Sequence, residues 1–171
     1  MKEGKKVCCF FGHRKIEETE DLKNRLYEIA ENLILNEDVD TFLFGSKSDF
    51  DYLCRKVVAE LKKKHKHIKR VYVRAEFPYI NKDYEEFLLE NFEETYYSEK
   101  ILNAGKAVYA ERNREMIDKS DICIVYYKES YAPSRRKNSK KDLFDYQPKS
   151  GTRIAYDYAS EKNKKIINVA T

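Results

Sequence analysis

Short apolar runs alternate with longer amphipathic patterns along this chain, and this alternation constrains its fold more than any other feature. Residues 7–11, Val-Cys-Cys-Phe-Phe, form a continuous apolar run that ends at Gly12, as expected for a strand buried on both faces. Leu22, Leu26 and Ile29 then begin a 3.6-residue repeat that is typical of a helix. The same succession recurs to the end of the chain, so strands and helices are expected in turn.

The expected strands are joined by helices rather than by tight turns, which determines how they pair. Strands are expected at residues 7–11, 41–44, 71–73, 122–127 and 166–169, and helices at about residues 22–34, 50–61, 106–117 and 151–162. Residues 78–104 are less regular, and a short helix followed by irregular chain is expected there. Because each helical crossover returns across a face of the sheet, neighbouring strands run parallel. The sequence therefore predicts an α/β fold: a three-layer, Rossmann-like, doubly wound, mainly parallel sheet of about five strands.

Length and composition limit the class of protein. The chain has 171 residues, and residues 1–171 are interpreted as a single domain with a long basic loop at about residues 128–150. The net charge of +4 is too mild for a nucleic-acid coat protein. No apolar run approaches the roughly 20 residues of a membrane span, and the apolar stretch near the N-terminus is too short for a signal peptide. A cytoplasmic protein without a membrane partner is expected.

The cysteines are also consistent with a cytoplasmic protein. Cys8, Cys9, Cys54 and Cys123 lack the paired spacing of metal ligands. Three of them lie in strand-like runs, and Cys54 lies in a helical pattern. They are interpreted as reduced core residues, and neither a metal nor a cofactor is expected.

Three turns and residues 126–128 are candidates for a binding site, because a doubly wound sheet binds its ligand beyond the carboxyl ends of the strands, at the switch point of strand order. The first turn is Gly12-His13-Arg14. Glycine lets the backbone approach a ligand closely, and the two side chains after it offer donors to a phosphate or a sugar. The alternative is a plain turn with two solvated side chains.

The second turn, Gly45-Ser46, follows the second strand and leads into a helix. It suits an anion-binding nest with Ser46 as a donor, whereas the alternative is simple helix capping by Ser48 or Asp49. Asp51 could accept hydrogen bonds from ribose hydroxyls or merely complement the helix dipole.

The third turn, Ser150-Gly151-Thr152, opens the last helix. Its small residues free the first-turn amides for a phosphate, and the alternative is again capping. On the helix before residues 122–127, the run Glu111-Arg112-Asn113-Arg114 is a solvated face by default, with one or two members turned inward. Because no GxGxxG and no GxxxxGK[ST] motif occurs, a standard dinucleotide fingerprint and an ATP-hydrolysing loop are disfavoured.

Four segments in combination resemble a known superfamily. They are a first strand ending in Gly-His-Arg, a glycine loop at residues 44–46, the passage Arg-Asn-Arg-x-Met-x-Asp-x-Ser-Asp at residues 112–121, and a Gly-Thr helix start. Together they resemble the SLOG superfamily, the Rossmann-like group that contains the DNA-processing protein DprA, the cytokinin-activating LOG enzymes and the YpsA-like proteins. The resemblance spans nearly the whole chain and is closest to the Gly-His-Arg, YpsA-like branch.

The resemblance implies a nucleotide or nucleotide-derived ligand in the switch-point cleft. In LOG enzymes, an arginine on the helix before the fourth strand and a glutamate in a PGGxGTxxE loop support cleavage of the base–ribose bond of a nucleoside monophosphate. Arg112 matches that arginine, whereas the glutamate position, three residues after Thr152, holds Ala155. The Pro-Gly-Gly is also missing, and a long basic connection stands in its place. The resemblance therefore implies a phosphate cradle, but the catalytic pair is incomplete unless Asp157 or Glu111 replaces the glutamate.

The favoured function is binding of a nucleotide or nucleotide-derived ligand at the carboxyl edge of the sheet, by a sensor or processing protein. One alternative is an N-glycosidase-like phosphoribohydrolase with Arg112 and Glu111 as candidate catalytic residues. Another is single-stranded nucleic-acid binding through the basic loop, which the mild net charge disfavours. Residues 79–97 suit either a homo-oligomer surface or a cover for the sheet. The candidate ligand-binding residues are Gly12, His13, Arg14, Gly45, Ser46, Asp51, Arg112, Ser150, Gly151 and Thr152.

Overall fold

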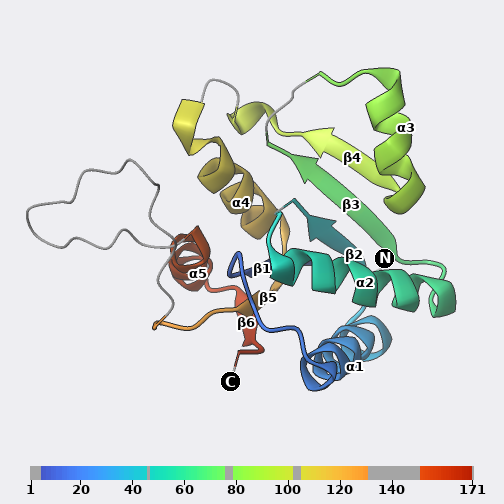
Figure 1. Cartoon of the computed structure of the whole chain (residues 1–171), viewed down its shortest axis with the longest axis vertical. Coiled ribbons are helices and arrows are strands. Elements are labelled where there is room, and N and C mark those ends of the chain that lie inside the picture. Colours follow the sequence, from blue (N-terminus) through green and yellow to red (C-terminus); the bar gives the residue numbers. More distant parts are fainter. Residues whose placement is uncertain (1–4, 46, 76–78, 102–104, 131–150, 171) are drawn as a thin grey trace, which may run out of the picture.

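The protein is built around a six-stranded, wholly parallel sheet with the strand order β4-β3-β2-β1-β5-β6 (Figure 1). The structure is a computed structural model that describes residues 5–45, 47–75, 79–101, 105–130 and 151–170. The chain winds outward from β1 to β4 and then crosses back to place β5 on the free side of β1. The order therefore reverses between β1 and β5, and the carboxyl ends of these two strands form the switch point.

The elements alternate as the sequence pattern predicts. The strands are β1 (Lys6–Gly12), β2 (Val39–Phe44), β3 (Lys69–Arg74), β4 (Glu94–Tyr97), β5 (Ile122–Tyr126) and β6 (Lys165–Asn168). The helices are α1 (Glu20–Asn36), α2 (Asp49–Lys64), α3 (Lys82–Asn91), α4 (Val108–Lys119) and α5 (Gly151–Glu161), with short 3₁₀ helices η1 (Glu99–Ile101) and η2 (Gly105–Ala107). Within the described ranges, no helix combines the length and apolar character that a membrane crossing requires.

Polar residues set where α1 and α2 begin. The side chain of Thr19 accepts a hydrogen bond from the Leu22 amide at 3.1 Å, and this bond caps α1. In α2, Ser48 accepts from the Asp51 amide at 3.0 Å. Such N-caps satisfy amides that a helix leaves without an internal partner, and each stabilises a helix by about 1 kcal/mol.

Alternate residues of β1 divide between the two faces of the sheet. Cys8 and Phe10 pack into the layer of α1, α2 and α3, whereas Cys9 and Phe11 pack into the layer of α4 and α5. Figure 1 shows these two helical layers on opposite sides of the sheet. Because β1 is covered on both faces, its apolar run is unbroken, and the predicted three-layer, doubly wound α/β fold is confirmed.

All four cysteines are buried free thiols, as expected for core residues. Cys9 and Cys123 are register partners on neighbouring strands, and their Sγ atoms lie 3.6 Å apart. Burial raises the pKa of the Cys9 thiol well above its ordinary range, and the Cys123 thiol beside it adds to this effect. The Cys9 thiol is therefore protonated at neutral pH and serves as a small apolar side chain.

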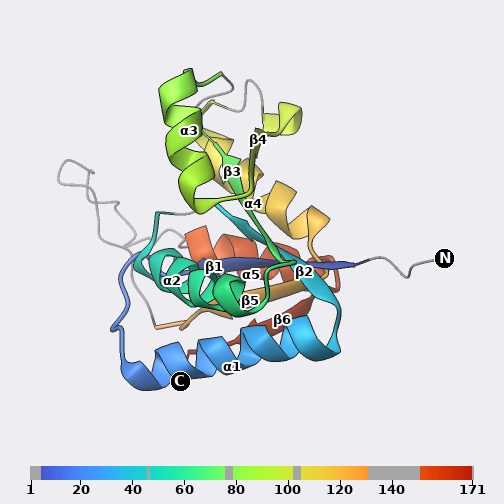
Figure 2. The ribbon, with the colours of Figure 1, turned by 90° about the vertical axis from the view of Figure 1, so that its right-hand side faces the viewer.

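The sheet has one strand more than the sequence pattern predicts. The short helix expected within residues 78–104 is present as α3, but part of the chain expected to be irregular forms β4, which pairs with the edge of β3. Figures 1 and 2 both place α3 and β4 at one end of the molecule. The pattern missed β4 because this strand is four residues long and only partly buried, so it lacks the apolar run that marks the other strands.

Candidate functional site

His13 joins the ends of β1 and β5 at the switch point. Gly12, the last residue of β1, is the register partner of Tyr126. The next residue, His13, is only 1% exposed. Its Nε2 atom accepts a hydrogen bond from the backbone N–H of Lys128 at 2.7 Å. His13 is therefore a buried link between two turns and not a solvated side chain.

This hydrogen bond determines the protonation state of His13. Because Nε2 accepts from a backbone amide, the ring is neutral and carries its proton on Nδ1, an assignment inferred from that contact. Burial lowers the pKa of His13 below 6.5, and the charge of Lys128 lowers it further. The ring also lies 6.0 Å from that of Tyr126 and 5.8 Å from that of Tyr127, both measured between ring centroids. At the switch point, a neutral imidazole is therefore packed beside the rings of Tyr126 and Tyr127.

Replacing His13 by phenylalanine is expected to lower the free energy of unfolding by about 1–2 kcal/mol at pH 7.5, because the Lys128 amide loses its acceptor. The pKa of His13 is lowered on folding, so its contribution is complete above pH 6.5 and declines as the pH falls below that value. The difference between wild type and His13→Phe should therefore shrink toward pH 5 in urea titrations. His67→Phe, at an exposed position, is the control. A difference that is constant with pH would contradict the assigned role.

Gly45 and Arg112 meet at the end of β2. Arg112 extends from α4 and is 6% exposed, and its Nη1 atom donates a hydrogen bond to the Gly45 carbonyl at 2.5 Å. A Cβ atom on Gly45 would lie 2.8 Å from Cδ of Arg112 and 2.9 Å from the carbonyl oxygen of Val73. No larger residue fits without displacing the arginine or the backbone. Gly45 is therefore the residue that lets a buried guanidinium approach the turn after β2.

Asp51 lies in the first turn of α2 and is completely buried. Its Oδ2 atom accepts a hydrogen bond from Nε of Arg55 at 2.7 Å. Burial raises the pKa of Asp51 from 3.8 to about 6, against the opposing effects of Arg55, Arg112 and the backbone of Gly45. In this position Asp51 orients Arg55 and supports the Gly45 turn, and it does not present its carboxylate to solvent for a ribose.

α5 packs beside the end of β5. Gly151 is the first residue of this helix and is exposed, whereas Thr152 is buried. Further along the helix, the ring of Tyr156 stacks on that of Tyr127 with 4.8 Å between centroids. Since Tyr127 also contacts His13, this stack connects α5 to the switch point. Ser46, Ser150 and residues 131–150 of the basic loop lie outside the described residues.

The remaining predicted residues have different surroundings. Arg14 is exposed beside the switch point, and its carbonyl accepts from the Asp49 amide at 2.8 Å. Glu111 is half-buried and forms an ion pair with Arg114. Among the described residues, no group of three or more His, Cys, Asp or Glu side chains could hold a metal ion.

Residues 126–128 are among the places to which the sequence points, but Lys128 acts there through its backbone amide, which no side-chain pattern reports. One contributor to this edge of the sheet, Arg55, was missed in the sequence. Arg55 carries a detectable signal, because it stands four residues after Asp51 on the same helix, and opposite charges at this spacing face one another.

Comparison with solved structures reveals a likeness of fold. The chain is similar to the molybdenum cofactor carrier protein MCP from Chlamydomonas reinhardtii, with a TM-score of 0.53 and 10% sequence identity, over 98% of this chain and 79% of that chain. At this identity the likeness shows the fold alone. No protein-family model matches the chain, and no curated protein matches its sequence. The fold and its switch point define a Rossmann-like α/β protein, and the relation to the SLOG superfamily stays a resemblance.

Proposed function

We propose that this protein binds a nucleotide or nucleotide-derived small molecule at the carboxyl edge of its sheet. The observation that carries the proposal is the burial of Arg112 against the Gly45 carbonyl, directly at the end of β2. A buried guanidinium is costly to desolvate, and here it adds fixed positive charge beneath a turn at the ligand edge of the fold. The similar structure of a molybdenum cofactor carrier supports a small-molecule ligand for this fold.

The proposed phosphate position lies among the turns after β1 and β2 and the start of α5. Gly12 and Gly45 end neighbouring strands of the sheet, so their turns are adjacent. The N-terminus of α5 contributes the positive end of a helix dipole and the amides of Gly151 and Thr152. Arg14 is exposed at the switch point, where it is available for a charge-assisted hydrogen bond to the anion. In this arrangement Arg112 and Asp51 are positioning residues.

The described residues favour neither alternative function. Glu111, a candidate acid for nucleotide hydrolysis, is engaged by Arg114. Most of the basic loop, which would contact single-stranded nucleic acid, lies outside the described residues. Hydrolysis and nucleic-acid binding are therefore not part of the proposal.

Replacing Arg14 by glutamine is expected to weaken nucleotide binding about tenfold or more, because a charge-assisted hydrogen bond is lost. The test is a calorimetric titration of AMP, cyclic AMP and NAD into wild type and variant. Lys63→Gln, an exposed site near the end of α2, is the matched control and should bind like wild type. Folded wild-type protein that binds none of these compounds, or equal binding by Arg14→Gln, would count against the proposed site.

A further inference from the structure

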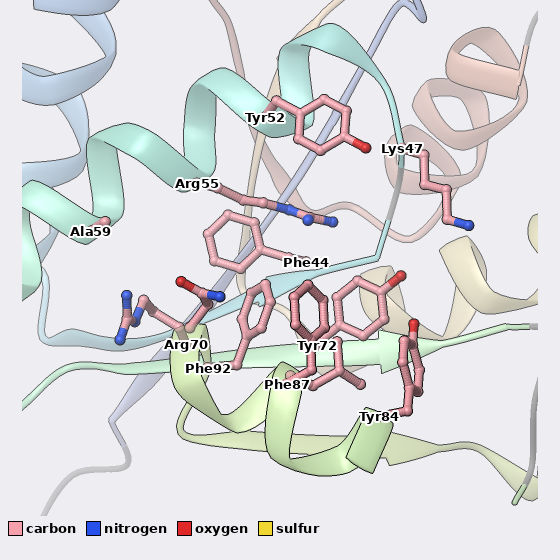
Figure 3. Close-up of a pocket in the computed structure, with 12 residues that line it drawn as sticks. Phe44, Lys47, Tyr52, Arg55, Ala59, Arg70, Tyr72, Tyr84, Phe87 and Phe92 are labelled. Carbon is pink, nitrogen blue, oxygen red and sulfur yellow. The ribbon is translucent and has the colours of Figure 1, made fainter. Parts of the chain in front are cut away.

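A pocket of about 340 Å³ opens between α2, α3 and β3, apart from the residues assigned above to the phosphate. Figure 3 shows Tyr52 and Arg55 extending into it from α2, opposite side chains of β3 and α3. Six aromatic side chains line this pocket: Phe44, Tyr52, Tyr72, Tyr84, Phe87 and Phe92. Small-molecule sites are mostly apolar and aromatic, with a few polar groups that orient the ligand, and this lining has the same character.

Aromatic rings stand exposed on both walls of the pocket. Tyr52 on α2 is 47% exposed and Phe87 on α3 is 58% exposed, although large apolar side chains are usually covered. The ring of Tyr84 lies beside that of Phe87, with 6.3 Å between centroids. The floor is already packed, since the rings of Tyr72 and Phe92 contact one another with centroids 5.3 Å apart. Core packing therefore does not explain the exposed rings, which suit stacking on a flat ligand.

The floor of the pocket also contains the phenol group of Tyr72. This side chain, on β3, is only 7% exposed and lines the pocket. Within the described part of the chain, its hydroxyl group has no hydrogen-bond partner. Burial raises the pKa of Tyr72 above 10, so the phenol is protonated at neutral pH and can donate a hydrogen bond. Because buried polar groups are nearly always paired, this hydroxyl points to an acceptor that occupies the pocket.

The arginine side chains in the wall are already engaged by carboxylates. The Nε atom of Arg55 donates to the buried carboxylate of Asp51 at 2.7 Å. Arg70 binds both carboxylate oxygens of Glu93. Lys47 is exposed, so water screens its charge. Recognition in this pocket therefore depends on its rings and on the Tyr72 hydroxyl, and not on net charge.

We propose that the pocket between α2 and α3 is a binding site for an uncharged, planar aromatic molecule that carries a hydrogen-bond acceptor, such as a carbonyl group, on its rim. The aromatic walls favour a flat ring system by stacking, the Tyr72 hydroxyl favours the acceptor, and the volume suits a small molecule. The proposal stands on the pocket alone and does not depend on a nucleotide at the strand ends.

The first test compares three lactones by NMR chemical-shift titration at pH 7.5, namely coumarin, its saturated analogue octahydrocoumarin, and the anion coumarin-3-carboxylate. Coumarin is expected to bind about tenfold more tightly than octahydrocoumarin, because only coumarin can stack. The carboxylate is expected to bind no more tightly than coumarin. Folded protein that does not bind coumarin, equal binding of the saturated analogue, or tighter binding of the anion would overturn the proposal.

The second test locates the acceptor at Tyr72. Tyr72→Phe removes one hydroxyl and should weaken coumarin binding about fivefold, since a neutral hydrogen bond is lost. The same variant should bind benzofuran, a flat bicyclic molecule without a carbonyl group, as wild type does. Tyr79→Phe, at a position that is 92% exposed and outside the pocket, is the matched control and should leave coumarin binding unchanged. If Tyr72→Phe changes the binding of coumarin and benzofuran equally, the assigned hydrogen bond is wrong.

The third test uses the exposed wall, where substitution does not disturb the core. Phe87→Ala should weaken coumarin binding about fivefold because a stacking surface is lost. Leu89→Ala, at an exposed position of the same helix outside the pocket, should bind like wild type. Arg14→Gln should also leave coumarin binding unchanged, which separates this site from the proposed nucleotide site. If Arg14→Gln abolishes binding, or Phe87→Ala leaves it intact, coumarin occupies another site and the proposal is wrong.

Discussion

Replacing Gly12 by alanine is expected to lower the free energy of unfolding by about 3 kcal/mol, because the added methyl group overpacks the core. A Cβ atom at this position would lie 2.4 Å from two ring carbons of Phe50 and 2.6 Å from its Cβ. Phe50 lies in the first turn of α2 and is completely buried, so its ring cannot move aside into solvent. The end of β1 or the first turn of α2 must shift instead. Urea unfolding of wild type and variant measures the loss.

The matched control for this prediction is Gly151→Ala. A Cβ atom there meets no described atom within 4 Å, and Gly151 begins α5. The substitution should leave stability unchanged or raise it by up to about 1 kcal/mol, since alanine favours the helix and restricts the unfolded chain. A second check is the pair Gly12→Ala and Phe50→Leu, whose combined loss should be smaller than the sum of the two single losses. Equal losses for both glycine variants would show that the Phe50 contact is not the cause.

Asp51 is expected to make the stability of this protein fall as the pH rises from 4 to 6. Burial raises the pKa of Asp51 from 3.8 to about 6, so within this window the folded chain keeps a proton that the unfolded chain has released. The contribution of Asp51 to the free energy of unfolding is therefore greatest below pH 3.8. It declines as the pH rises, until the carboxyl group of the folded chain is also ionised. The pKa difference corresponds to about 3 kcal/mol across the whole window.

Asp51→Asn isolates this contribution, because an amide does not titrate. Free energies of unfolding measured from pH 4 to pH 7 should show wild type losing about 2.5 kcal/mol relative to Asp51→Asn. Asp49→Asn is the control, since Asp49 lies in the same helical turn but is exposed. A wild type that gains stability relative to Asp51→Asn as the pH rises would reverse the sign and refute the proposed cause.

The layered architecture follows from sequence wherever a strand is buried on both faces. Residues 7–11 and 122–126 are unbroken apolar runs, and each proved to be a central strand of the sheet. Edge positions gave a weaker signal. β4 has the sequence Glu-Thr-Tyr-Tyr and is only partly buried, so neither an apolar run nor a clear alternation marks it.

The candidate site could be placed from the sequence only by the glycine turns that mark the ends of strands. His13 and Arg112 do lie at those ends, but the sequence could not show that both are buried and engaged with backbone groups. Asp51 was predicted to meet ribose hydroxyls or to complement the helix dipole, whereas its partner in the structure is an arginine one helical turn away. No sequence pattern indicates the pocket between α2 and α3, because its walls come from separate helices and strands whose side chains meet only after folding.

The carboxylate of Asp51 interacts with two regions of this molecule. Asp51 interacts with Arg112 and the backbone of Gly45 on one side, and it anchors Arg55 in the aromatic pocket on the other. A ligand bound in one region that changes the protonation or position of this carboxylate also changes the free energy of ligand binding in the other region. Thermodynamic reciprocity requires the two effects to be equal in size, so Asp51 is where any cooperativity between the strand ends and the pocket would reside.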